Sequence, residues 1–159
     1  MTDNLWNLDE VTRTDMRLVL ATLKEHSGYA LIDCPVFKPF GASLDLNGAV
    51  RVTVAQLDGQ PDLLEYRNVL IRGFRNQAAR GEIRAAGYAE LGRFPEGAGE
   101  VDTVLIRIEC RDGVSSLVSV PYSVEGPDKV SFGESVIMRA EPWLWVELDH
   151  AARAEPALQ

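Results

Sequence analysis

One short stretch of the sequence gathers residue types that acid–base or ligand-binding chemistry requires. Glu109 and Asp112 flank Arg111, and Tyr122 closes the next predicted strand. A carboxylate and a phenol that converge near a guanidinium can bind a small polar ligand or move a proton. The alternative interpretation is structural: a surface ion pair across a turn, with Asp112 forming the bend and Tyr122 packing at the sheet edge.

The rest of the sequence shows no motif for nucleophilic, phosphate or metal chemistry. Ser115 and Ser116 lie inside a predicted strand and lack the Gly-x-Ser-x-Gly turn of hydrolases. The glycine-rich stretch 97–99 is flanked by glutamates and lacks the lysine of a phosphate loop. Cys34 and Cys110 are far apart, so we expect two buried free thiols and no zinc site. We therefore expect no catalytic residue, no metal and no cofactor.

Hydrophobic periodicity predicts the helices that must position these residues. Apolar residues spaced at three and four positions predict a first helix that starts at Asp9 or Thr14 and ends at Gly28. A second helix is predicted over residues 62–80, where Gly81 stops it. Each helix has one apolar stripe, so each must cover part of a sheet.

Alternating apolar and polar residues predict five strands. They are Phe40–Leu46, Ala49–Gln56, Ile83–Leu91, Val101–Cys110 and Val114–Val124. The order helix, two strands, helix, three strands predicts an α+β fold of two layers: an antiparallel sheet of about five strands with both helices on one face. The segment 129–146 is expected to add short strands. We expect residues 1–146 to form one domain and residues 147–159 to form a frayed tail or short helix.

The composition excludes several classes of partner. The chain of 159 residues has a formal net charge of −8 and a pI near 4.8. Such a charge repels phosphate backbones and anionic membrane surfaces, so we expect no nucleic-acid binding and no membrane binding. No apolar run approaches the roughly 20 residues of a membrane span. The first four residues lack the basic start of a signal peptide, which predicts a cytoplasmic protein.

Several short motifs resemble a group of bacterial proteins without an established activity. In that group a strand ending in a Glu-x-Arg-x-Gly turn leads to Pro-Tyr and then Phe-Gly; here these are residues 109–113, Pro121-Tyr122 and Phe132-Gly133. The similar spacing extends upstream to the first predicted hairpin and so covers most of the chain. The group has His where this chain has Cys110, so no role for an imidazole is implied. By element order alone, the chain is also similar to profilin-type and roadblock-type modules, and loosely to small acidic secretion chaperones.

Two further features indicate a surface for a partner. Trp143 and Trp145 project on one side of a proline-led extended segment, where they either close the core or form an interface. Arg72 and Arg75 lie one turn apart on the second predicted helix, whereas the C-terminal part of the chain is rich in carboxylates. This asymmetry either steers self-association or a partner, or it reflects solvated faces and a tail folded back on the helix.

These observations predict a non-enzymatic protein-interaction module of a bacterial cytosol, which acts on a protein partner or as a homodimer. A second hypothesis is a small-ligand sensor or weak enzyme that uses Glu109, Arg111 and Tyr122, and it requires a pocket that joins these side chains. A third is an acidic immunity-type or chaperone-type protein that covers a basic partner protein, which predicts a salt-sensitive complex.

Overall fold

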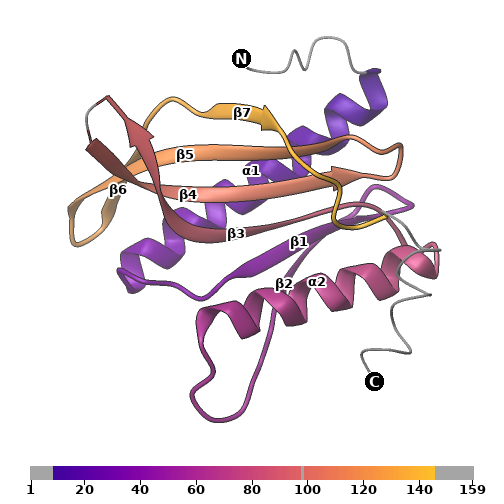
Figure 1. The fold of residues 1–159 in the computed structure, drawn as a ribbon, viewed down its shortest axis with the longest axis horizontal. Coiled ribbons are helices and arrows are strands. Elements are labelled where there is room, and N and C mark those ends of the chain that lie inside the picture. The colour runs from indigo at the N-terminus through magenta and orange to yellow at the C-terminus, as the bar shows by residue number, and fades with distance from the viewer. Residues whose placement is uncertain (1–8, 98, 146–159) are drawn as a thin grey trace.

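The computed structural model describes residues 9–97 and 99–145. In this part of the chain there are two helices, α1 (Glu10–Asp33) and α2 (Leu63–Ala79) (Figure 1). The strands are β1 (Phe40–Asp45), β2 (Val50–Val54), β3 (Ile83–Glu96), β4 (Gly99–Cys110), β5 (Ser115–Gly126), β6 (Lys129–Phe132) and β7 (Val136–Arg139). The predicted α+β class and the order helix, two strands, helix, three strands are confirmed.

Helix α1 starts as predicted but ends later. The side chain of Asp9 caps it by accepting a hydrogen bond from a backbone N–H of the first turn. The prediction that Gly28 ends the helix is wrong, because Leu31 in the following turn is buried in the core and keeps the chain helical. The helix stops where Cys34 precedes Pro35, since the residue before a proline disfavours the helical conformation.

The strands form one sheet in the order β2-β1-β3-β4-β5-β6, and all neighbouring pairs are antiparallel. β3 and β4 make a long hairpin in which residues 85–96 pair with residues 99–110. The two short strands beyond residue 129 are present, as expected. Both pair with β5: β7 along residues 116–119 and β6 along residues 122–126.

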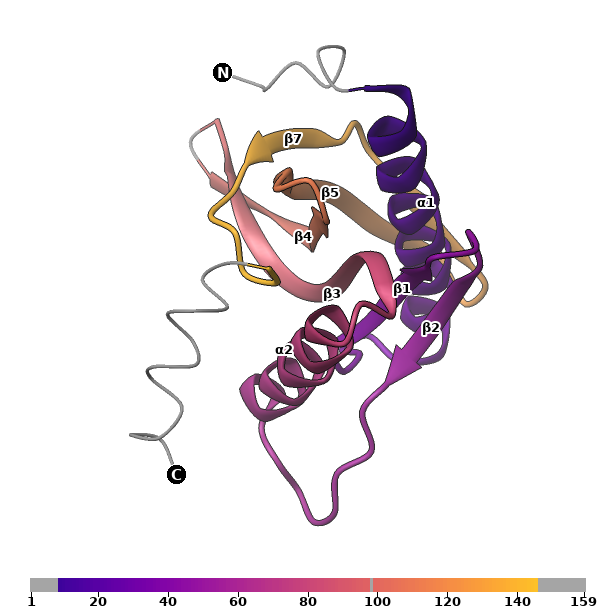
Figure 2. The ribbon, with the colours of Figure 1, turned by 90° about the vertical axis from the view of Figure 1, so that its right-hand side faces the viewer.

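The two helices lie on opposite faces of the sheet, so the prediction that they share one face is wrong. Along β3, Ala85 and Ala89 belong to the core under α1, whereas Ala86 and Tyr88 pack with α2. Since successive side chains of a strand point to opposite faces, α1 and α2 must lie on opposite sides of β3. Figure 2 shows the two helices on either side of this strand.

Small residues on the second face of the sheet explain why α2 packs there. A Cβ atom at Gly41 of β1 would lie 2.5 Å from the ring of Phe74 in α2, so only glycine lets the helix approach this closely. An apolar stripe predicts that a helix covers a sheet, but it does not predict which face the helix covers. The small residues at alternate positions of β1 and β3 decide which face α2 covers.

The buried residues form two clusters. The larger one, between α1 and the sheet, contains Met16, Val19, Leu23, Leu31, Phe37, Phe40, Ala42, Leu44, Ala85, Ala89, Val104, Ile106, Ile108, Cys110, Val118 and Val120. The smaller one, under α2, contains Leu70, Phe74, Ala78, Ile83, Ala86, Tyr88, Trp143 and Leu144. Neither helix of the described chain is long and apolar enough to cross a membrane. The predicted tail, residues 147–159, lies outside the described residues.

Candidate functional site

Glu109, the central residue of the sequence-predicted site, is completely buried. Its exposed fraction is 0%. Its two neighbours in β4, Ile108 and Cys110, both belong to the core on the α1 side of the sheet. Glu109 therefore points to the α2 face of the sheet. A buried carboxylate needs hydrogen-bond donors to offset the loss of its hydration.

Three backbone groups supply those donors. Oε1 of Glu109 accepts hydrogen bonds from the N–H groups of Trp143 at 2.6 Å and Leu144 at 3.0 Å, and Oε2 accepts one from Trp145 at 2.9 Å. Both oxygens of the Glu109 side chain thus have at least one hydrogen-bond donor. These hydrogen bonds tie residues 141–145, which we call the C-terminal strap, to the α2 face of β4. The side chain of Glu109 thus binds the backbone of its own chain.

The C-terminal strap is packed as part of the smaller core. Trp143 is only 4% exposed, and its ring meets those of Tyr88 and Phe74 edge-on, at centroid distances of 5.1 and 6.5 Å. Arg75 Nε donates a hydrogen bond of 2.7 Å to the carbonyl oxygen of Trp143. Trp145 is partly buried against the same core. In this fold Trp143 closes the core.

The two candidate arginines of α2 therefore have different environments. Arg75 reaches the C-terminal strap, whereas Arg72 is exposed on the outer side of α2 and makes no hydrogen bond or ion pair with the described residues. Three further arginines, in α2, just after it and at the start of β3, form a cluster with these two, and each has a carboxylate partner: Arg67 pairs with Glu90, Arg80 with Glu82 and Arg84 with Asp15. The cluster is thus largely accounted for by local ion pairs.

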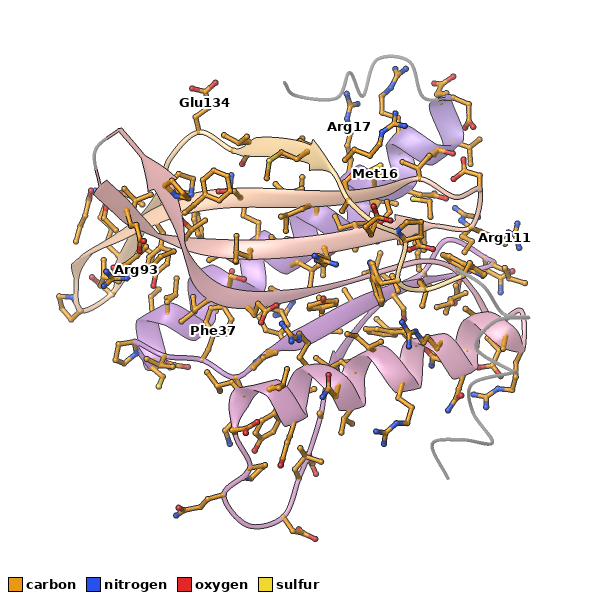
Figure 3. All side chains as sticks on the ribbon, viewed as in Figure 1. Met16, Arg17, Phe37, Arg93, Arg111 and Glu134 are labelled. Atoms are coloured by element: carbon orange, nitrogen blue, oxygen red, sulfur yellow. The ribbon has the colours of Figure 1, made fainter. Side chains whose placement is uncertain are left out.

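The other residues of the predicted acid–base site do not converge on Glu109. Arg111 lies in the turn between β4 and β5, and its side chain points outward (Figure 3). Asp112, in the same turn, accepts a hydrogen bond from the hydroxyl of Thr12. Tyr122 packs against the larger core on the opposite face, about 20 Å along β5 from the residue that pairs with Glu109. The structure therefore does not join these side chains in one pocket.

The cysteines offer no nucleophile in the core. Both are free; Cys110 is buried, whereas Cys34 is exposed because it follows the last turn of α1, so the prediction of two buried thiols is wrong for Cys34. Burial raises the pKa of the Cys110 thiol to about 12, which leaves it protonated and unreactive at neutral pH. Among the described residues, no three His, Cys, Asp or Glu side chains gather as metal ligands.

A feature that the sequence reasoning missed lies at the other end of the sheet, on β2. Among the described residues this strand pairs only with β1, so β2 is an edge strand. The N–H of Asp45 bonds the carbonyl of Ala49, and antiparallel partners alternate between bonded and non-bonded pairs. It follows that the backbone N–H and C=O groups of Val50, Val52 and Val54 point away from β1, toward the open edge.

An apolar groove runs beside this open edge, between β2 and α2. It has a volume of about 240 Å³ and is lined by Thr53, Val54, Ala55, Val69, Leu70, Gly73, Phe74 and Gln77. Gly73 leaves part of the groove empty, because a Cβ atom there would meet no other atom within 4 Å. The alternation of β2 was visible in the sequence, but its position at the sheet edge was not. That position depends on β3 pairing with β1.

Comparisons with known proteins identify no relative. The chain matches no protein-family model, no curated protein and no solved structure.

Proposed function

We propose that this protein is a protein-interaction module that binds an extended protein segment as an additional strand beside β2. The observation that carries the proposal is the combination of an open edge strand with an apolar groove along the same edge. Strand addition uses both features: the backbone groups of the edge give affinity, and pockets for alternate side chains give specificity.

The side chains on both faces of an added strand would contact apolar surface. Val52 and Val54 share the face of α1 but remain 39% and 62% exposed, because α1 does not cover them. Side chains of an added strand on this face would pack beside these valines. Its remaining side chains would point to the α2 face and enter the groove next to Gly73.

The edge carries few of the devices by which proteins block unwanted strand pairing. Edge strands are usually protected by inward-pointing charges, prolines or bulges. β2 consists of Val50, Arg51, Val52, Thr53 and Val54, so it contains one charge and no proline, and its register with β1 is regular. Such an edge can pair with a strand of another protein chain.

The size and lining of the groove favour a protein segment over a small ligand. Pockets for small ligands usually measure roughly 300–1,000 Å³ and contain a few converging polar groups. This groove is smaller, and its lining residues are apolar except for Thr53 and Gln77. A groove of this kind accommodates one or two apolar side chains of a longer segment.

The test uses a fluorescent peptide of alternating valine and threonine, with a lysine at each end for solubility. Its binding is measured by fluorescence anisotropy against the wild-type chain and two variants. Val52→Pro removes one outward N–H without touching the β1 pairing, and Gly73→Trp fills the groove. We expect both variants to bind at least about tenfold more weakly than wild type, a loss of about 1.4 kcal/mol.

Matched controls separate a lost site from a lost fold. Val52→Thr keeps the N–H, and Gly73→Ala leaves most of the groove open, so both should bind the peptide like wild type. Circular dichroism checks the fold of all four variants. A peptide with a central proline should not bind. Equal affinity of the wild type, Val52→Pro and Gly73→Trp, or no saturable binding by the wild type at concentrations where it is monomeric, would contradict the proposed function.

A further inference from the structure

We infer that the segment added at β2 is the β2 strand of a second copy of this chain, so that two sheets join across a two-fold axis at Val52. The inference rests on the proposed function, because it uses the same edge and names the partner. It follows from the symmetry of β2 itself, in its backbone groups, its apolar face and its charge.

All three outward-facing positions of β2 can pair with a second copy at once in only one antiparallel register. Outward-facing groups occur at Val50, Val52 and Val54, and are therefore spaced evenly about Val52. When two copies run antiparallel with Val52 opposite its own counterpart, each Val50 lies opposite a Val54. All three positions then form bonded pairs. A shift by one residue would place outward groups opposite inward ones, so it is excluded.

The side chains are also self-complementary in this register. On the α1 face, Val50, Val52 and Val54 of both copies form one continuous apolar strip, which reduces the exposure of Val52 and Val54. On the α2 face, each Arg51 lies opposite a Thr53 that lines the groove, so the aliphatic stem of Arg51 packs along the groove while its guanidinium stays in water. No like charges face each other, a condition that antiparallel pairs require, since like charges directly opposite are destabilising.

The segment that forms this contact carries no negative charge, although the whole molecule is acidic. Each copy carries a net charge of −8, so two copies repel each other at long range. Residues 49–55 contain no carboxylate and one arginine, which keeps the negative charge away from the contact. Contacts that use the same patch on both copies are the commonest way in which soluble proteins form dimers. The edge of β2 can form a contact of this kind.

The first experiment measures mass in solution by size-exclusion chromatography with light scattering. We expect the full chain to have twice its monomer mass of 17.5 kDa, and the Val52→Pro variant to have the monomer mass. Val52→Thr, which keeps the outward N–H and a β-branched side chain, should remain dimeric. The variant Val124→Thr serves as a control at an exposed valine far from the edge, on β5, and should not change the mass.

The second experiment tests the register by disulfide formation. It uses a Cys34→Ser background, because Cys34 is an exposed thiol and Cys110 is buried. A Val52→Cys variant should oxidise to a covalent dimer, since bonded partners in an antiparallel pair have Cα atoms about 5.5 Å apart, within disulfide range. Val54→Cys alone should cross-link much more slowly. A mixture of Val50→Cys and Val54→Cys chains should form the mixed disulfide instead.

The outcomes separate this inference from the proposed function. A monomeric wild-type chain that still binds the valine–threonine peptide at β2 overturns the inference and leaves the proposed function standing. A monomer that binds no peptide contradicts both. A dimer that persists in Val52→Pro, or one in which Val52→Cys and Val54→Cys cross-link equally fast, overturns the inference because the contact then lies elsewhere or in another register.

Discussion

The carboxylate of Glu109 and the backbone of Trp143 are in direct contact: Oε1 accepts the Trp143 N–H at 2.6 Å. The carbonyl of the same residue accepts a hydrogen bond from Arg75 at 2.7 Å, so the main chain of Trp143 is bonded on both of its sides. β4 and α2 thereby hold the C-terminal strap jointly. Glu109, the acid at the centre of the sequence-predicted site, stabilises the fold, and Asp112 in the following turn bonds Thr12 instead.

Replacing Glu109 should lower the free energy of unfolding more than the loss of any surface charge. Glu109→Ala leaves three N–H groups of the C-terminal strap without their acceptor, and each unsatisfied buried donor costs about 1–3 kcal/mol. We expect a loss of about 3–5 kcal/mol for Glu109→Ala, and about 1–3 kcal/mol for the isosteric Glu109→Gln, which keeps one acceptor oxygen. Urea unfolding measures both.

A surface glutamate provides the control for this prediction. Glu90 is partly exposed and pairs with Arg67 at 3.3 Å, so Glu90→Gln should change the stability by less than about 1 kcal/mol. If Glu109→Gln were as stable as Glu90→Gln, the three hydrogen bonds to the C-terminal strap would not contribute to the fold as argued here.

Two glycines should respond to the same substitution with opposite signs. A Cβ atom at Gly41 would lie 2.5 Å from the Phe74 ring, so Gly41→Ala must displace that ring and should destabilise the protein by about 1–3 kcal/mol. Gly73 lies inside α2 with open space around it, so Gly73→Ala should stabilise by about 0.5–1 kcal/mol through its higher helix propensity. Thermal unfolding of the two variants decides the signs, and equal signs would contradict the placement of α2.

Trp143 should tolerate phenylalanine much better than alanine. Its ring is buried between Phe74 and Tyr88, so Trp143→Ala should cost about 3–5 kcal/mol. Within the described part of the chain the indole N–H is buried without a hydrogen-bond partner, and Trp143→Phe removes that unsatisfied donor together with part of the ring. We expect Trp143→Phe to cost less than about 1.5 kcal/mol in urea unfolding. Equal costs for the two variants would show that ring packing is not what holds this residue.

The elements were predictable where a local signal fixed them. The prediction of a helix over residues 62–80 agrees with α2 to within a residue at each end, because Asp62 caps its start and Gly81 adopts a positive φ of 69° just after it. The predicted strands Ile83–Leu91 and Val101–Cys110 leave residues 92–100 outside the sheet, yet most of these residues extend β3 and β4. Pairing between two strands overrides the low strand propensity of the glycines and glutamates there.

The long-range arrangements were not predictable from the pattern alone. The partner of Glu109 comes from residues 143–145, and no local signal links a carboxylate to N–H groups more than thirty positions later. The choice of sheet face for α2 depends on Gly41, whose role appears only when Phe74 is placed above it. The edge position of β2 depends in the same way on the pairing of β1 with β3.

The buried thiol of Cys110 should make the protein less stable in alkali. Its pKa rises from 9.0 to about 12 on folding, first because burial penalises the thiolate and then because of nearby carboxylates such as Asp112. Below pH 9 the thiol is protonated in both states, so its contribution to the free energy of unfolding is complete. Above pH 9 the thiol of the unfolded chain loses its proton while the buried thiol keeps it, so the folded state becomes less stable. The loss is about 1.4 kcal/mol per pH unit up to about pH 12. Burial also raises the pKa of Tyr88, which adds a loss of the same sign above its ordinary value of 10.0.

A Cys110→Ala variant isolates the contribution of the thiol, because Tyr88 and the other groups titrate equally in both proteins. Urea unfolding at about pH 8 and about pH 10 gives the change in stability for each protein. We expect the wild type to lose about 1.4 kcal/mol more than Cys110→Ala between these conditions. The same burial predicts that Cys34 reacts with a thiol reagent in the native state, whereas Cys110 reacts only after unfolding. An equal pH dependence in both proteins, or rapid reaction of both thiols in the native state, would mean that Cys110 is not buried in the core beside Ala85.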